Sequence, residues 1–435
     1  HTWNALDGQK GDGTYDRGSY WYVKTLDKWE PSAKYSRLFL EIPAAGQQAK
    51  VFVNGEFVVS HEGGYSAFRA DITEKCTEEF NTIAIWCSNE KCDAIYPQSA
   101  DFTFYGGLYR GAHLICVPET HFELLHYGDL GIHAATEPAS WDKEDFMLHI
   151  RTKICGVEKD NQVIYQIFDE DGKEVASAAR PADSPDTSIP LYKPHRWDIK
   201  NSYQYTLKAL IMRNNECLDE VELKFGVRTF CCDPGRGFLI NGNCVPLRGV
   251  SRHQDKLYQG NALTKEDHIR DAELIEEIGA NTVRLAHYQH AQEFYDECDK
   301  RGFVVWAEIP FISVMNEDPL AHENCITQLK ELIYQNDHHP SICFWGISNE
   351  ILIGGISEKL VENHRELNAL AKKIDPYRLT TIAHVTMTPK DGPMHEITDV
   401  ESYNHYFGWY GGKTEDNGPW MDEYHEKYPN RCIGL

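Results

Sequence analysis

From Phe230 onward the sequence alternates between short apolar runs and segments with helical periodicity. Thr264, with Asp267 three residues on, predicts a helix start, and Gly279 is placed to end that helix. The apolar run at 303–307 is typical of a strand covered on both faces. Alternating strands and helices predict a parallel sheet, either a (β/α)₈ barrel or a doubly wound sheet. No glycine-rich phosphate loop follows the first predicted strand, which favours the barrel.

Seven strands are predicted in this region, at residues 245–250, 282–286, 303–307, 342–347, 379–383, 399–403 and 431–435. A barrel of this type closes with eight strands, so seven leave the first and last without their shared neighbour. We therefore expect the barrel segment, residues 230–435, to be incomplete after its seventh strand. An eighth strand is expected past Leu435.

Before residue 230, short alternating apolar runs separated by turn residues predict β structure. Asn54-Gly55 between two such runs predicts a hairpin, because these residues accept the positive φ angles of a type I′ turn. Pro118 interrupts the pattern and separates two blocks of about 100 residues each. Two β-sandwiches in series are expected, at residues 1–118 and 119–229.

Charge and composition exclude several classes of partner. The chain carries 67 acidic and 43 basic residues, a net charge of -24, and has no dense basic run, so nucleic acid is not expected. It has no apolar stretch of about eighteen residues and no signal-peptide layout, so we expect a cytoplasmic protein without a membrane span. The 13 cysteines lack paired CxxC spacing, and most are expected to be buried thiols.

Polar residues follow the predicted strands, where a barrel places its active site. Singly each has an ordinary explanation, such as a helix cap for Glu308 or a surface ion pair for Arg284. Together they favour an active site based on carboxylates. They are His253 after the first strand, Arg284 and His287 after the second, Glu308 after the third, Asn349 and Glu350 after the fourth, and Asn404 and Tyr406 after the sixth.

Glu350 closes an apolar strand, at 342–347. Partial burial favours the neutral carboxyl group. A protonated glutamic acid can donate a proton to a leaving oxygen, which glycoside cleavage requires of one of its two carboxyl groups. The neighbouring Asn349 amide can hydrogen-bond a sugar hydroxyl.

Four segments carry a resemblance to a known family. Residues 337–350 resemble the acid/base signature of glycoside hydrolase family 2, the β-galactosidase and β-glucuronidase family, and residues 281–288 are similar to its second signature. Residues 247–253 resemble the first barrel strand of the family, and residues 101–110 resemble the loop that its sugar-binding sandwich extends towards the barrel. The resemblance implies an N-terminal jelly-roll sandwich, an immunoglobulin-like sandwich and a TIM barrel.

The resemblance also implies a role for each polar residue. Glu350 is the expected general acid/base, with Asn349 on the 2-hydroxyl; the other expected sugar-binding residues are Asp101, His253, His287 and Tyr406, and Arg284 is expected to support the nucleophile. No metal is expected, since the family's metal ligands after the third strand have no match in residues 306–311. No other cofactor is expected.

The family's nucleophilic glutamate follows the seventh strand and is therefore expected past Leu435. Glu401 is rejected as a substitute because it lies near the start of the sixth predicted strand. Since retaining hydrolysis needs two carboxyl groups, the 435-residue chain alone is expected to be inactive.

The sequence favours a retaining hydrolase of terminal β-linked sugars, with β-galactosides first because of the loop at 101–110. β-Glucuronidase and β-galacturonidase remain alternatives on the same scaffold. A non-catalytic carbohydrate-binding fragment is the alternative from another class. The expected partner is an oligosaccharide or glycoside, and the expected assembly is a homo-oligomer.

Overall fold

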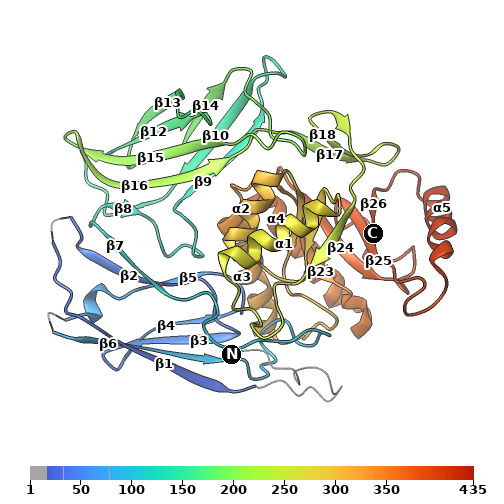
Figure 1. Ribbon diagram of the computed structural model, residues 1–435, viewed down its shortest axis with the longest axis horizontal. Helices are drawn as coiled ribbons and strands as arrows, with labels where there is room; N and C mark the ends of the chain where they lie inside the picture. Colours follow the sequence, from blue (N-terminus) through green and yellow to red (C-terminus); the bar gives the residue numbers. More distant parts are fainter. Residues whose placement is uncertain (1–16, 33, 78) are drawn as a thin grey trace.

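The computed structural model of the chain describes residues 17–32, 34–77 and 79–435. Two β-sandwiches lie one below and one above in Figure 1, and both adjoin a unit of parallel strands and helices. The strands of the two sandwiches fall inside residues 1–118 and 119–229, which stay predictions as domain boundaries.

The first sandwich packs a sheet of order β1-β6-β3-β4 on a sheet of order β5-β2-β7. Alternate residues such as Leu40, Val51 and Ile85 are buried between the two sheets. Asn54 and Gly55 have φ angles of 51° and 85°, so the predicted hairpin joining β3 and β4 is confirmed. The strands are β1 (Ser19–Leu26), β2 (Arg37–Ile42), β3 (Gln48–Val53), β4 (Glu56–Glu62), β5 (Phe68–Asp71), β6 (Asn81–Ser88) and β7 (His113–Val117).

The second sandwich packs a sheet of order β14-β10-β9 on a sheet of order β13-β12-β15-β16, with β8 and β11 paired beside them. Its core includes Leu148 from the first sheet and Tyr165 and Leu207 from the second. The strands are β8 (His121–Phe122), β9 (Ile132–Pro138), β10 (Phe146–Thr152), β11 (Ile154–Cys155), β12 (Gln162–Phe168), β13 (Glu174–Pro181), β14 (Thr187–Leu191), β15 (Tyr205–Arg213) and β16 (Glu216–Phe225).

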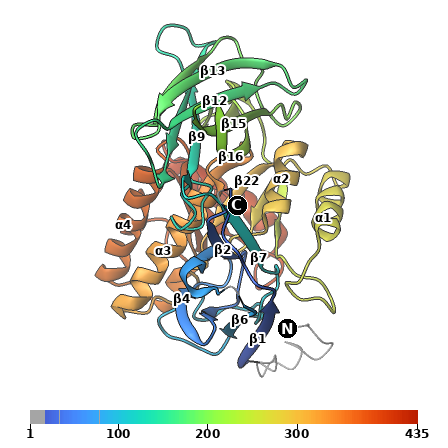
Figure 2. The same ribbon diagram turned by 90° about the vertical axis from the view of Figure 1, so that its left-hand side faces the viewer.

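The third unit is a seven-stranded parallel sheet in which every strand pairs with the next strand along the chain. This order never reverses, as it must in a doubly wound sheet, so the barrel alternative is confirmed. Figure 2 shows α1 and α2 on one side of the unit and α3 and α4 on the other. The elements are β20 (Gly249–Arg252), α1 (Lys265–Glu277), β21 (Thr282–Leu285), α2 (Gln292–Arg301), β22 (Val304–Glu308), α3 (Pro319–Asn336), β23 (Ile342–Asn349), α4 (Glu358–Ile374), β24 (Leu379–Val385), β25 (Val400–Asn404), α5 (Asn417–Lys427) and β26 (Ile433–Gly434).

Two predicted strands are placed differently. The first barrel strand is β20, which begins at Gly249, not at residue 245, because Pro246 has no N–H to donate to the sheet. The preceding residues form a small antiparallel sheet of β17 (Phe230–Asp233), β18 (Gly237–Ile240) and β19 (Asn243–Cys244). The last strand, β26, is shorter than predicted. Within the described chain β20 and β26 are the ends of the sheet, and the eighth strand stays a prediction.

Local signals at the helix ends are confirmed. Asp267 donates its backbone N–H to the Thr264 hydroxyl and accepts from the Thr264 N–H, which completes a capping box at α1. Gly279 follows α1 with φ of 79°, and Gly302 ends α2 with φ of 71°. Both glycines adopt the left-handed conformation that terminates helices.

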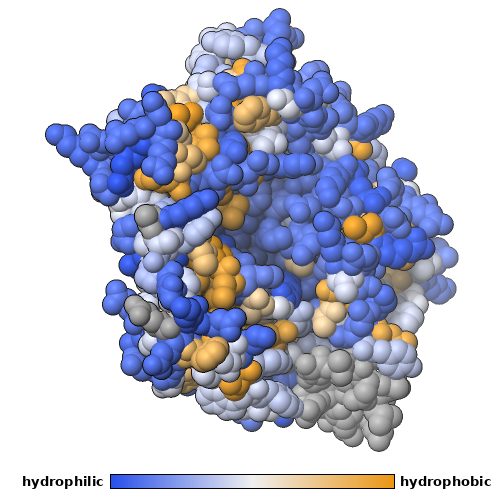
Figure 3. Space-filling view, turned by 60° about the vertical axis from the view of Figure 1, so that its left-hand side comes forward, coloured by the Kyte–Doolittle hydropathy of each residue, from blue (hydrophilic) through white to orange (hydrophobic). Residues whose placement is uncertain are grey.

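The surface of the protein is mostly polar, and the burial of its cysteines differs from the prediction. The face drawn in Figure 3 is mostly hydrophilic, with apolar residues in separate patches and a hollow near its centre. Among the described residues no helix is long and apolar enough to cross a membrane.

All 13 cysteines are free, but only Cys87, Cys298, Cys325 and Cys343 are buried, so the expectation that most are buried was wrong. Several lie on β-strands, where alternate residues face solvent.

Candidate active site

Parallel strands end at one edge of a sheet, and that edge gathers the predicted polar residues. Arg284 lies on β21, Asn349 is the last residue of β23 and Glu350 follows it, and Asn404 is the last residue of β25. Asn404 joins the other three: its Nδ2 donates to Glu350 Oε1 and to Asn349 Oδ1, both at 2.9 Å, and its Oδ1 accepts from Arg284 Nη1 at 2.7 Å. The acid and the amide predicted from adjacent sequence positions are therefore held by one side chain from another strand.

Glu350 occupies an unusual backbone position at the end of β23. Its φ of 49° lies in the left-handed region, which non-glycine residues rarely adopt. Its N–H donates to Ala383 O at 2.7 Å, and a short 3₁₀ helix, Ile351–Gly354, follows at once. Such conformations concentrate at functional sites, where the surrounding structure stabilises them.

Glu308 fixes the position of Arg284 through two hydrogen bonds. Its Nε and Nη2 donate to the two carboxylate oxygens of Glu308 at 2.9 and 3.0 Å, and its guanidinium lies 4.3 Å from the centre of the Trp306 ring. Burial alone would raise the pKa of Glu308, but Arg284 and His287 outweigh burial and lower it. Glu308 therefore stays ionised and anchors the guanidinium that also donates to Asn349 Oδ1 at 2.6 Å.

His253 and His287 lie side by side, with ring centres 5.1 Å apart. Burial, followed by the charge of neighbouring groups, lowers the pKa of His253 to about 4, so this ring is neutral near pH 7. Tyr288 contacts His253 Nδ1 through its hydroxyl at 3.2 Å. A neutral imidazole can both donate and accept, as recognition of sugar hydroxyls requires.

The loop of the first sandwich reaches this edge of the barrel, as the sequence predicted. The Phe102 ring lies 5.0 Å from the His253 ring and 6.0 Å from the His287 ring. Asp101, next to it, is exposed. Burial, and then charges that include those of Glu350 and Asp101, raise the pKa of Tyr406. Phe102 of the loop thus contacts both histidines, and Asp101, Glu350 and Tyr406 lie close enough for their charges to act on one another.

Glu401 faces the opposite side of the sheet. Its Oε2 accepts from His384 Nε2 at 2.9 Å and from His395 Nδ1 at 2.8 Å. The neighbouring Ser402 and, two residues further on, Asn404 line the cavity inside the barrel instead. The rejection of Glu401 as a nucleophile therefore agrees with the geometry.

A cavity with a volume of about 830 Å³ lies along the inner face of the sheet. It meets the polar cluster at Arg284, Asn404 and Tyr406, but most of its lining comes from β18, β20 and β26 and the segments beside them. Glu350 is not part of that lining. The catalytic role is therefore assigned to the hydrogen-bonded group of Arg284, Asn349, Glu350 and Asn404, and not to the cavity as a whole.

Three residues gained a role that sequence reasoning did not assign. Asn404 and Glu308 were recognised only as polar residues at strand ends, and Trp306 only as part of an apolar run. The strand-end position of Asn404 and Glu308 was the available signal. Their hydrogen-bond partners lie on other strands: Arg284 is 120 residues from Asn404 and 24 residues from Glu308. Local sequence patterns could therefore not predict these hydrogen bonds.

A carboxyl group, two amides and two histidines at the mouth of a barrel, with an aromatic loop contributed by a sandwich, define a site of carbohydrate-enzyme type. The family model described as the glycosyl hydrolases family 2 TIM barrel domain matches residues 234–431, and the model described as glycosyl hydrolases family 2 matches residues 139–228. The chain belongs to glycoside hydrolase family 2.

Several relatives are similar along most or all of the chain. A β-glucuronidase of Bacteroides fragilis is 36% identical over 453 residues, which cover 100% of this chain and 64% of that protein. A β-galactosidase of Thermoanaerobacter pseudethanolicus is 30% identical over 411 residues, 91% of this chain and 52% of that protein. The crystal structure of an FMN-binding β-glucuronidase from Facaelibacterium prausnitzii L2-6 superposes with a TM-score of 0.97 at 53% identity and covers 100% of this chain and 67% of that one. The chain thus spans about two thirds or less of these relatives.

Proposed function

We propose that the protein that contains this chain is a retaining glycoside hydrolase for terminal β-linked sugars, with Glu350 as general acid/base. One observation carries the proposal: Asn404 binds both Glu350 Oε1 and Asn349 Oδ1, so a proton donor and a sugar-binding amide share one anchor. Glu350 would protonate the glycosidic oxygen in the first step and take a proton from water in the second.

The remaining polar residues receive binding and positioning roles in the same proposal. His253, His287 and Asp101 hold sugar hydroxyls, and Tyr406 binds the substrate beside the nucleophile. Arg284 supports the nucleophilic carboxylate, whose position past Leu435 stays a prediction. Neither Glu308 nor Glu401 is suited to that role, because a nucleophile must reach the sugar and both are buried, at 0% and 3% exposure.

β-Glucuronides are the first candidate substrates, ahead of the β-galactosides that the loop at 101–110 suggested. The relatives described as β-glucuronidases support this order, since they include the matches with the highest sequence identity given above. β-Galactosides and β-galacturonides remain to be compared. A homo-oligomeric state stays a prediction.

The acid role is tested by Glu350→Gln in the full-length enzyme. We expect the rate with a poor leaving group, such as an alkyl β-glucuronide, to fall by about 10²- to 10⁴-fold. The nitrophenyl glycoside should lose less in bond cleavage and should show a burst of nitrophenol, because the second step also needs the base. Glu358→Gln, an exposed change a few residues away, is the control. Equal losses for both leaving groups would remove Glu350 from the acid role.

The sugar is identified by comparing kcat/KM for nitrophenyl β-glucuronide, β-galactoside and β-galacturonide. The proposal expects the glucuronide to be highest. A higher value for the galactoside would return the assignment to β-galactosidase. Binding of these sugars without turnover of any of them would favour the non-catalytic alternative.

We propose that hydrolysis itself requires no metal or redox cofactor. Two carboxyl groups complete the reaction without electron transfer. The residues at 306–311 also support this view, since Glu308 is saturated by Arg284 and His287. Because one relative is described as FMN-binding, the absorbance spectrum of the purified protein should be recorded. Equal kcat with and without bound flavin is the expected result.

A further inference from the structure

Three side chains converge where the second sandwich meets helix α3 of the barrel. His126 and Asp129 lie on the segment before β9, and His133 lies on β9 itself. The His126 and His133 rings contact Tyr334 of α3, with ring centres 4.6 and 5.4 Å away. The group therefore belongs to the junction between two domains and not to the candidate active site.

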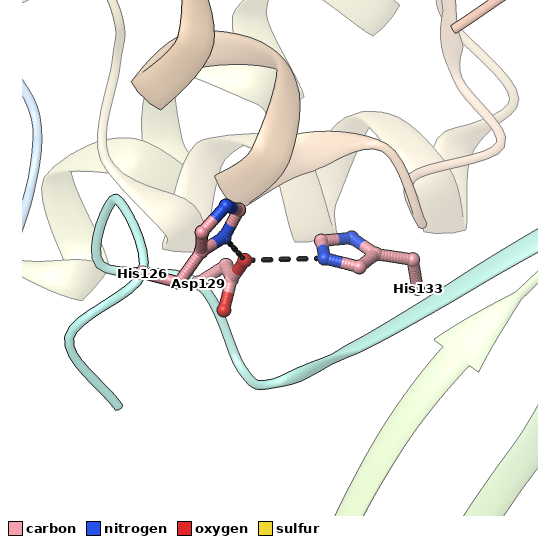
Figure 4. A group of neighbouring side chains, drawn as sticks. All are labelled: His126, Asp129 and His133. Carbon is pink, nitrogen blue, oxygen red and sulfur yellow. Dashed lines mark hydrogen bonds and ion pairs between the residues drawn. The ribbon is translucent and has the colours of Figure 1, made fainter. Parts of the chain in front are cut away.

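Both histidines turn a nitrogen towards the same oxygen of Asp129, as Figure 4 shows. His126 Nδ1 lies 2.6 Å and His133 Nε2 lies 3.1 Å from Asp129 Oδ2. The contact of His133 lacks the angles of a hydrogen bond, so this buried nitrogen has no hydrogen-bond partner among the described residues. Three ligand-type atoms thus face one another within 4.8 Å, and His133 Nε2 is held among them by an ion-pair contact without hydrogen-bond geometry.

Neighbouring residues fix His133 and Asp129 by hydrogen bonds, as they do for the ligands of metal sites. His133 Nδ1 is 2.9 Å from Asp337 Oδ2, at the end of α3, and Asp129 Oδ1 accepts the Gly131 N–H at 2.8 Å. A ring nitrogen bonded to a carboxylate presents its other nitrogen as a ligand, and an anchored carboxylate presents its free oxygen. His133 is 5% exposed and Asp129 1%, whereas the side chain of His126 is 21% exposed, so the group is open to solvent at one side.

We propose that His126 Nδ1, Asp129 Oδ2 and His133 Nε2 bind one divalent ion of the zinc class, with water completing its coordination. Two imidazoles and one carboxylate suit Zn²⁺, whereas Ca²⁺ takes oxygen ligands. Ligand atoms about 2.0 to 2.2 Å from one ion lie roughly 3 to 3.4 Å apart. The His126 contact with Asp129 has to lengthen to that value, and the two ring nitrogens, which lie within 4.8 Å of each other, have to come to a similar separation. The ion would fasten the second sandwich to α3 through Asp337.

A second histidine and carboxylate group in the chain fits an ion less well. In the group of His384, His395 and Glu401 both nitrogen contacts meet hydrogen-bond geometry, and all three residues are buried. That group is satisfied by its own hydrogen bonds. The junction group differs because one of its two nitrogen contacts lacks hydrogen-bond geometry and because it has a side open to solvent.

The proposal is tested with the full-length protein after removal of metal by chelator and dialysis. Zinc titration by calorimetry, with elemental analysis, should give one tight site per chain, and zinc should raise Tm by mass action. Calcium at the same concentration should do neither. Cobalt(II) should bind without the near-ultraviolet charge-transfer band of thiolate ligands, which excludes the exposed cysteines.

Graded variants separate ligands from supporting residues. Asp129→Asn and His133→Gln should weaken zinc binding by more than about 100-fold, and Asp337→Asn by about 10- to 100-fold. His149→Gln, at a histidine and carboxylate pair on the sandwich surface, is the matched control and should bind as the parent does. If a buried variant fails to fold, His126→Gln, at the partly exposed ligand, carries the test. Unchanged affinity in His126→Gln, or the absence of a one-to-one site in the parent, would overturn the proposal and leave a hydrogen-bonded cluster.

Discussion

Glu308→Gln tests how the candidate site is held in place. Glu308 is 0% exposed, and both its oxygens accept from Arg284, whose side chain is 12% exposed. Glutamine keeps the shape of the side chain but removes its charge. The Arg284 guanidinium then stays buried over Trp306 without a carboxylate partner. Nothing charged fixes its position any longer, although it still has to donate to Asn349 and Asn404.

The magnitude follows from the burial of the pair. Removing one member of a buried ion pair costs about 3 to 5 kcal/mol, because the other charge is left uncompensated. The amide oxygen of the substituted side chain can still accept one bond, which recovers about 1 kcal/mol. We expect the free energy of unfolding to fall by about 3 kcal/mol at pH 7. Since the pKa of Glu308 is lowered in the folded protein, this contribution exists above its unfolded value and is lost as the pH falls.

Urea unfolding followed by tryptophan fluorescence measures this loss as a shift of the midpoint at constant slope. The difference between parent and variant should shrink as the pH is lowered below about 4.3. Glu358→Gln should change the free energy of unfolding by less than about 0.5 kcal/mol. A Glu308→Gln protein within about 1 kcal/mol of the parent at pH 7 would refute the argument that this pair is a buried anchor.

Two further predictions concern other carboxyl and amide contacts. Asn404→Ala should lower kcat about 10²-fold with a small change in KM, because Asn404 orients Glu350 without being the proton donor; a change in KM alone would contradict this positioning role. Although burial raises the pKa of Glu401, hydrogen bonds from two histidines lower it to about 2. Its contribution, about 3 kcal/mol, is therefore present above pH 4.5 and lost towards pH 2, and Glu401→Gln should flatten that acid-dependent loss of stability in urea titrations.

The order of local elements was predictable because its signals are local. The capping box at Thr264, the terminating glycine at 279 and the Asn54-Gly55 turn each depend on a few neighbouring residues. The first barrel strand was misplaced where Pro246 interrupts an apolar run. Hydrophobic periodicity predicts that a helix or strand exists more reliably than it predicts where that element begins and ends.

The sequence by itself determined which residue types stand at the strand ends, and therefore that a carboxyl group with amides and histidines meets at one edge of the sheet. Tertiary structure decided how they are connected. Asn404 lies 54 residues from Glu350, and Arg284 lies 120 residues from Asn404, yet they share hydrogen bonds. Parallel pairing brings such distant positions together, and a hydrogen bond depends on distance and angle in space, which spacing along a chain does not specify. The same reason applies to His133 and Asp337, whose contact exists only because the second sandwich packs on the barrel.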